Sequence, residues 1–210
     1  MQSTKFAALA VLAATSVACT TGPIAGISDQ EARRLAETAV ATSFQDVPEE
    51  WKIRLVQDDT QRLCSEAQDR PDKALADRIE KANQSTGVRY PASGKLIGDF
   101  KRGEAIAQSG FGLRVGDDTK RETGGNCYAC HQLTKQEISY GTLGPSLLAF
   151  GKLRGNSDAI VKYTYDKIYN AQAFTACSNM PRFGTNKILT PEQISDLVAL
   201  LLDPKSPVNQ

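Results

Sequence analysis

The 210-residue sequence predicts an all-α fold, because its apolar residues recur at helical spacing and strand-like runs are few. Two of the helical stretches also begin with residue types that cap helices, Ser157 and Thr190. The chain is 40% hydrophobic and 23% charged, which suits one good core plus a small extra region. The formal net charge of +1 argues against a nucleic-acid partner, since such binders are normally basic.

Residues 1–18 are typical of a signal peptide. Lys5 gives the start a positive charge, "FAALAVLAATSVA" is an apolar core of signal length, and Ser16-Val17-Ala18 is a small-x-small cleavage site. A buried N-terminal helix is the alternative, but the run has no caps and no polar face. The mature chain is therefore expected in the periplasm, an oxidising compartment. Cys19 follows the cleavage site and is a candidate for a lipid anchor, although Ser16 stands where a large aliphatic residue is usual.

Residues 19–95 are predicted to form a helical N-terminal extension. "DQEARRLAETAVATSF" and "DRPDKALADRIEKAN" both have helical patterns, and Leu75, Ile79 and Ala82 make a narrow apolar stripe in the second. Because so few apolar residues are present, an independent core is not expected. The extension is expected to wrap the following domain or to meet a partner, and a solvated, poorly packed segment is the alternative.

Three further helices are expected in residues 96–210, in the stretches "FKRGEAIAQSGFGL", "GNSDAIVKYTYDKIY" and "TPEQISDLVALLL". Ser157 is the expected N-cap of the second stretch. The third has the clearest start, with Thr190 as N-cap, Pro191 at the first helical position and Gln193 completing a capping box.

The stretch "GGNCYACHQL" carries the strongest chemical signal. Cys127 and Cys130 are followed directly by His131, the only histidine of the chain. A redox disulfide would need a preceding strand, and zinc would need further Cys or His ligands at a compatible spacing. The C-x-x-C-H spacing instead indicates attachment of one c-type haem, in which both thiols form thioethers and the imidazole binds the iron.

Met180 is the candidate for the second axial position of that iron. A second histidine ligand is excluded, and Met1 leaves with the signal, so Met180 is the only mature methionine. It lies in "CSNMPRFG", a loop bounded by breaker residues, which suits a presented ligand better than a core position. Cys177, a lysine or an open position are the alternatives, and core packing is the other use of a methionine.

Gly144-Pro145, in the stretch "GPSL", lies between the two candidate ligands. The second ring nitrogen of His131 needs a hydrogen-bond acceptor to fix its tautomer, and a backbone carbonyl here is able to serve. A plain turn is the alternative, and the spacing does not choose between the two.

These motifs resemble a class I cytochrome c domain over residues 96–204. "GGNCYACHQL", "GTLGPSL" and "NMPRFG" are more specifically similar to the SoxX family, the monohaem subunit of the SoxAX complex of bacterial thiosulfate oxidation. The resemblance implies that Cys127 and Cys130 bind the haem, that His131 and Met180 ligate its iron, and that Pro145 orients His131. Short members of that family lack much of what precedes residue 96, so the resemblance says less about the extension.

The resemblance also implies a function. SoxAX joins thiosulfate oxidatively to a cysteine of the carrier SoxYZ, an L-cysteine S-thiosulfotransferase activity whose catalytic haem belongs to the dihaem or monohaem partner SoxA. The present chain would be the electron-accepting subunit of that heterodimer, with no catalytic residue of its own, and would pass electrons to a soluble cytochrome c. The alternative is a free periplasmic monohaem carrier without a catalytic partner.

Three residues remain to be placed. Cys64 and Cys177 are left over after haem attachment, and an oxidising compartment favours a disulfide between them. Two buried free thiols or a bridge to another chain are the alternatives. Arg182, beside Met180, is expected to bind a haem propionate or to face the partner subunit.

Overall fold

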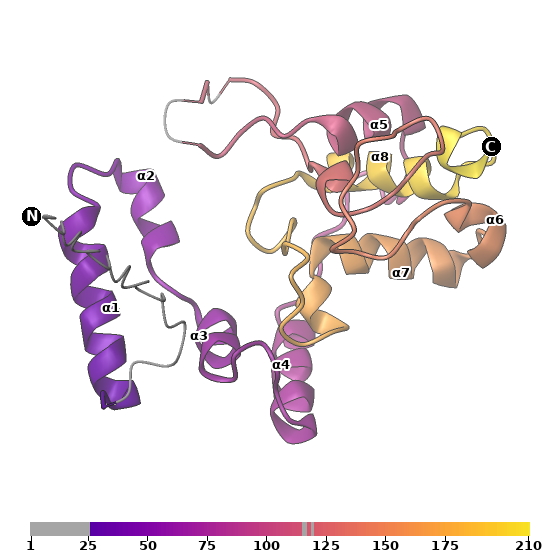
Figure 1. Ribbon diagram of the computed structural model, residues 1–210. Helices are drawn as coiled ribbons and strands as arrows, with labels where there is room; N and C mark the ends of the chain where they lie inside the picture. The colour runs from indigo at the N-terminus through magenta and orange to yellow at the C-terminus, as the bar shows by residue number, and fades with distance from the viewer. Residues whose placement is uncertain (1–25, 115–116, 119) are drawn as a thin grey trace, which may run out of the picture. The chain divides into compact units, whose positions relative to one another are not determined.

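The computed structural model describes residues 26–114, 117–118 and 120–210. The predicted signal peptide and Cys19 lie outside these residues. The chain divides into two compact units, Met1–Val56 and Gln57–Gln210, and each is described by itself. Every regular element in the described ranges is helical, so the predicted all-α class is confirmed (Figure 1).

The first unit contains the helices α1 (Asp29–Ser43) and α2 (Glu49–Lys52) and the short 3-10 turn η1 (Ile53–Leu55). Ser28 caps α1 by accepting a hydrogen bond from the Glu31 backbone at 3.2 Å. None of the side chains described in this unit is buried, and Ile53 is 75% exposed. The described part of this unit therefore has no hydrophobic core. Across the described residues, no helix has both the length and the apolar character needed to cross a membrane.

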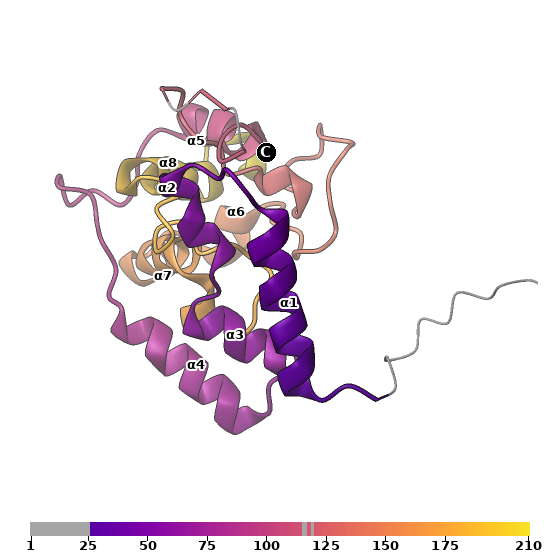
Figure 2. The same ribbon diagram turned by 90° about the vertical axis from the view of Figure 1, so that its left-hand side faces the viewer.

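The second unit holds the remaining helices: α3 (Asp59–Glu66), α4 (Lys73–Ser85), α5 (Phe100–Gln108), α6 (Phe150–Arg154), α7 (Asp158–Tyr169) and α8 (Pro191–Leu202). Three 3-10 turns accompany them: η2 (Cys127–Ala129), η3 (Ala171–Ala173) and η4 (Pro207–Asn209). This unit begins at Gln57, so it includes α3 and α4 from the predicted extension. The two lie side by side in both views (Figure 2).

Helix α8 is the centre of the second unit. Its predicted capping box is present, because Thr190 accepts from the Gln193 backbone while the Gln193 side chain accepts from the Thr190 backbone. All residues from Gln193 to Leu202 are buried. The core packed around them takes apolar side chains from every part of the unit between α5 and the C-terminus, including Ile106, Leu133, Val161, Tyr165, Phe183 and Val208.

Helices α5 and α8 cross in backbone contact (Figure 1). The contact requires Gly103, because a Cβ atom there would lie 2.1 Å from the carbonyl oxygen of Asp196. Asp196 is buried, and its Oδ1 accepts hydrogen bonds from the Asp99 backbone at 2.8 Å and from Arg102 Nη2 at 3.0 Å. A polar contact therefore helps to fix the position at which α5 crosses α8.

The C-terminal tail is bound to α6 and to the end of α8 by one side chain, that of Asn209. Asn209 is buried, and its Oδ1 accepts hydrogen bonds from the backbone of Gly151 at 2.8 Å and of Lys152 at 3.2 Å, in the first turn of α6. Its Nδ2 donates to the carbonyls of Leu201 and Asp203 at 3.0 and 2.9 Å. One side chain therefore satisfies backbone groups of α6 and of the end of α8 together.

Candidate haem site

The C-x-x-C-H segment is held against the end of α5 by its backbone. Gly125 donates to the Ile106 carbonyl at 2.8 Å, and Asn126 donates to the Ser109 carbonyl at 2.9 Å. The chain then turns through η2, and the His131 backbone donates to the Cys127 carbonyl at 2.9 Å. This tight turn explains how two residues four positions apart, Cys127 and His131, come to line the same cleft.

The ring of His131 is fixed by the loop that follows it. Its Nδ1 lies 2.7 Å from the carbonyl oxygen of Pro145. A carbonyl only accepts, so Nδ1 carries the hydrogen, and in the neutral imidazole Nε2 keeps its lone pair. Gly144 lies directly against the ring, where a Cβ atom would be 2.2 Å from His131 Cε1. The glycine thus allows the loop to approach the ring closely enough for the Pro145 carbonyl to accept the hydrogen bond.

A narrow, largely apolar cleft contains both predicted iron ligands. Cys127 and His131 line one part of it and Met180 lines another. Its other walls are apolar side chains from α7, α8 and the connecting loops, namely Leu133, Leu147, Ile168, Phe183, Leu197, Leu200 and Leu201. The cleft therefore combines a thiol, an imidazole and a thioether with walls that exclude water, which is the donor set and the environment that suit a c-type haem.

The alternatives for the cysteine pair fit this environment poorly. Burial raises the pKa of the Cys127 thiol to about 12, whereas redox-active and zinc-binding cysteines need a readily formed thiolate. Cys127 and Cys130 are not joined to each other by a disulfide. Among the described residues, the one group able to assemble three metal-ligating atoms is Cys64, Asp69 and Cys177, away from this pair.

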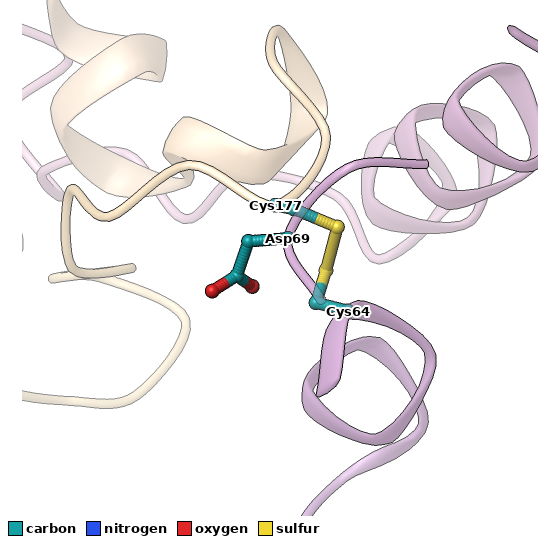
Figure 3. A group of neighbouring side chains, drawn as sticks. All are labelled: Cys64, Asp69 and Cys177. Atoms are coloured by element: carbon teal, nitrogen blue, oxygen red, sulfur yellow. A yellow bond between two sulfur atoms is a disulfide. The ribbon is translucent and has the colours of Figure 1, made fainter. Parts of the chain in front are cut away.

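The closeness of Cys64, Asp69 and Cys177 is explained by a covalent bond. Cys64 of α3 and Cys177 of the loop between α7 and α8 form a disulfide, and Asp69 lies beside it (Figure 3). Because their sulfurs are bonded to each other, Cys64 and Cys177 have no thiolate to offer a metal. Together with Ile79 the two cysteines make a small second core. Cys177, one of the alternative iron ligands, is therefore already engaged.

Met180 belongs to the loop from 170 to 189 that joins α7 to α8. Helices α3 and α4 brace this loop. The Asn170 amide donates to Asn83 Oδ1 at 3.1 Å, Gln84 Nε2 donates to the Ala173 carbonyl at 2.8 Å, and Glu80 Oε1 accepts from the Ala176 backbone at 3.1 Å. With the disulfide, these contacts hold the first part of the loop, up to three residues before Met180.

Arg182 is placed just after Met180 and is buried. Its guanidinium forms an ion pair with Oδ2 of Asp58, the N-cap residue of α3. The expected role of Arg182 in binding a haem propionate or a partner stays a prediction. The sequence patterns do not single out Asp58. A local signal was present, because Asp58 and Gln61 form a capping box, but nothing local connects Asp58 to a residue 124 positions away.

A wider hollow of about 460 Å³ lies elsewhere on the second unit. Its lining is mixed, with the charged residues Arg89, Glu122 and Lys187 alongside Tyr169 and Leu189. The lining contains neither the cysteine pair nor the two predicted iron ligands. The smaller apolar cleft, which contains Cys127, His131 and Met180 but is not lined by Cys130, is therefore the candidate haem site.

Two comparisons with known proteins bear on this site. Residues 116–204 match the family described as Cytochrome c, and the match includes Cys127, Cys130, His131 and Met180. The whole chain is similar to a protein of Aquifex aeolicus (strain VF5) described as an uncharacterized lipoprotein. The two are 34% identical over 208 residues, which is 95% of each chain.

Proposed function

This chain belongs to one family with the Aquifex aeolicus protein and contains a cytochrome c domain with covalently bound c-type haem, and from this premise we propose that it is the electron-accepting subunit of a SoxAX-type complex. When bound, the haem supplies one-electron exchange at its iron. The observation that carries an electron-transfer function is the cleft itself, which presents His131 and Met180 between apolar walls.

The chain's own residues account for this chemistry. Cys127 and Cys130 hold the haem covalently, and His131 offers Nε2 to the iron because Pro145 engages the other ring nitrogen. Met180 would bind the haem iron through its thioether, a soft ligand that favours the reduced iron and raises the potential. With His131 and Met180 both bound to it, the iron would have no place for a substrate. The domain therefore transfers electrons, and substrate chemistry belongs to another subunit.

The motifs "GGNCYACHQL", "GTLGPSL" and "NMPRFG" support the SoxAX assignment by their resemblance. In the proposed reaction, a cysteine thiolate of the carrier SoxYZ and the outer sulfur of thiosulfate form a sulfur–sulfur bond, and two electrons are released. The electrons leave singly, because the haem accepts one at a time. In this scheme the partner SoxA binds the reacting sulfurs, and the present chain passes each electron to a soluble cytochrome c.

We also propose that the mature chain is a periplasmic protein anchored by a lipid at Cys19. The relative from Aquifex aeolicus is described as a lipoprotein, and Cys19 directly follows Ser16-Val17-Ala18. A lipid anchor would hold the domain at a membrane surface. Mass measurement of the mature N-terminal peptide tests this directly, because an acylated Cys19 is heavier than the free residue by the mass of its lipid.

The decisive experiment compares two arrangements of the exported, haem-loaded chain. The chain is produced alone and together with a SoxA-type subunit, and both preparations are examined for a stable haem-bearing heterodimer and for thiosulfate-dependent haem reduction in the presence of SoxYZ. A heterodimer reduced only when all three components are present supports the proposal. A redox-active monomer that ignores the SoxA-type subunit supports the alternative, a free electron carrier.

A further inference from the structure

Arg182 gives the loop of Met180 a buried positive charge. Its side chain is only 9% exposed, so the guanidinium has lost most of its water. A buried cation needs a close counter-charge, because its desolvation is otherwise uncompensated. The carboxylate of Asp58, which is 47% exposed, supplies that counter-charge from the N-terminus of α3.

Asp58 uses its two oxygens for different purposes. Oδ1 accepts a hydrogen bond from the Gln61 backbone at 2.9 Å and caps α3. Oδ2 receives the guanidinium of Arg182. The same helix carries Cys64, whose disulfide partner Cys177 lies three residues before Met180. Helix α3 therefore holds the loop at two points, one on each side of Met180.

We propose that Asp58 is a positioning residue for Met180. The ion pair with Arg182 holds the second half of the loop, as the disulfide holds the first half, and keeps the Met180 thioether in the cleft. The inference rests on the proposed binding of Met180 to the haem iron. Loss of the Asp58 charge leaves Arg182 buried without a counter-charge. The loop then relieves this cost by moving Arg182 toward water, and Met180, two residues away, moves with it.

The variant Asp58→Asn tests the charge separately from the helix cap. Asparagine caps helices as well as aspartate does, so α3 is expected to persist. Asp72→Asn is the matched control, because Asp72 caps α4 through the Leu75 backbone at 2.8 Å and, among the described residues, makes no hydrogen bond or ion pair with the loop of Met180. Both variants remove one carboxylate from a helix N-cap, and only the first removes the partner of Arg182.

Imidazole binding to the oxidised protein provides the readout, since added imidazole competes with Met180 for the iron and leaves the covalent haem in place. We expect Asp58→Asn to raise the apparent imidazole affinity about tenfold, which corresponds to about 1.4 kcal/mol. Asp72→Asn should leave the affinity at the wild-type value. Asp58→Glu, which restores the charge, should return the affinity most of the way to wild type.

The outcomes separate this proposal from the proposed function. If Met180→Ala leaves the spectrum of the oxidised protein unchanged, Met180 is not the ligand and the functional assignment of the loop is wrong. If Met180→Ala changes the spectrum but Asp58→Asn and Asp72→Asn bind imidazole equally, the role of Asp58 alone is overturned. If Asp58→Asn does not fold, the double variant Asp58→Asn/Arg182→Gln, which has no buried unpaired charge, is tested instead. The proposal requires it to bind imidazole more tightly than wild type.

Discussion

The carbonyl oxygen of Pro145 lies 2.7 Å from Nδ1 of His131. In the neutral imidazole this contact decides which ring nitrogen is free, because the carbonyl requires the one ring hydrogen to be on Nδ1. A neutral imidazole with a fixed orientation is the form that binds a metal. The loop that follows the haem-attachment motif thus prepares the histidine for ligation.

Gly144→Ala should weaken the hydrogen bond between His131 and the Pro145 carbonyl. The added methyl would lie 2.2 Å from His131 Cε1, so the ring must move away from Pro145. Loss of such a partner typically costs about 10–100-fold in metal affinity. We therefore expect absorption spectroscopy of the variant to show a mixture of haem forms, with part of the iron no longer bound by His131. Ser146→Ala, in the same loop, is the control and should show the wild-type spectrum.

Met180→Ala should remove the sulfur-to-iron charge-transfer band at the red edge of the oxidised spectrum and lower the reduction potential. The thioether is a neutral, soft ligand that favours the reduced iron, and its loss favours the oxidised iron. Absorption spectroscopy and a redox titration measure both effects. Asn179→Ala, at the exposed neighbouring position, is expected to change neither. An unaltered band and potential in Met180→Ala would mean that another group holds that position.

The disulfide should contribute strongly to stability. Cys64 and Cys177 are separated by 113 residues, and in the chain-entropy description a loop of that length gives a large stabilisation. We expect Cys64→Ser/Cys177→Ser to lower the free energy of unfolding by about 2–5 kcal/mol. Denaturant titration measures the loss, and non-reducing peptide mapping of the wild type should recover the two cysteines in one linked pair. Alkylation of both thiols without prior reduction would contradict the bridge.

Asn209→Ala tests the connection of the C-terminal tail. The variant loses two acceptor and two donor contacts, and the backbone groups of α6 and α8 that they satisfy are left unpaired. We expect a loss of about 2–4 kcal/mol in unfolding free energy, since each buried contact contributes roughly 1 kcal/mol. Gln210→Ala, at the exposed next residue, should cost much less. Equal losses of unfolding free energy in the two variants would show that the Asn209 contacts contribute no stability of their own.

The helices that the sequence predicts well are those with both a cap and an apolar face. Helix α8 is an example, since Thr190, Pro191 and Gln193 define its start and apolar residues such as Ile194, Leu197 and Val198 follow at helical spacing. Helix α3 was not predicted, although Asp58 and Gln61 form the same kind of capping box. Its eight residues contain little apolar periodicity, and its position depends on contacts with distant residues.

The residues of the candidate site likewise fall into those that the sequence predicts and those that it does not. Cys127, Cys130 and His131 are recognisable because their chemistry needs a fixed local spacing. Asp58 and the apolar cleft walls are not recognisable locally, because each comes close to the site only through the fold. The ion pair of Asp58 with Arg182 depends on helix α3 lying beside a loop 124 positions later. Periodicity and capping patterns carry no information about contacts between residues so far apart in the sequence.

The disulfide between Cys64 and Cys177 encloses the haem-attachment motif within the stretch of chain that it closes. Among the four cysteines that follow Cys19, only a single bond between Cys64 and Cys177 leaves thiols at both Cys127 and Cys130. If the chain matures in the proposed oxidising compartment, one pair must therefore be oxidised while the other stays reduced until the haem is attached. A disulfide that took up Cys127 or Cys130 first would leave that sulfur unable to form its thioether.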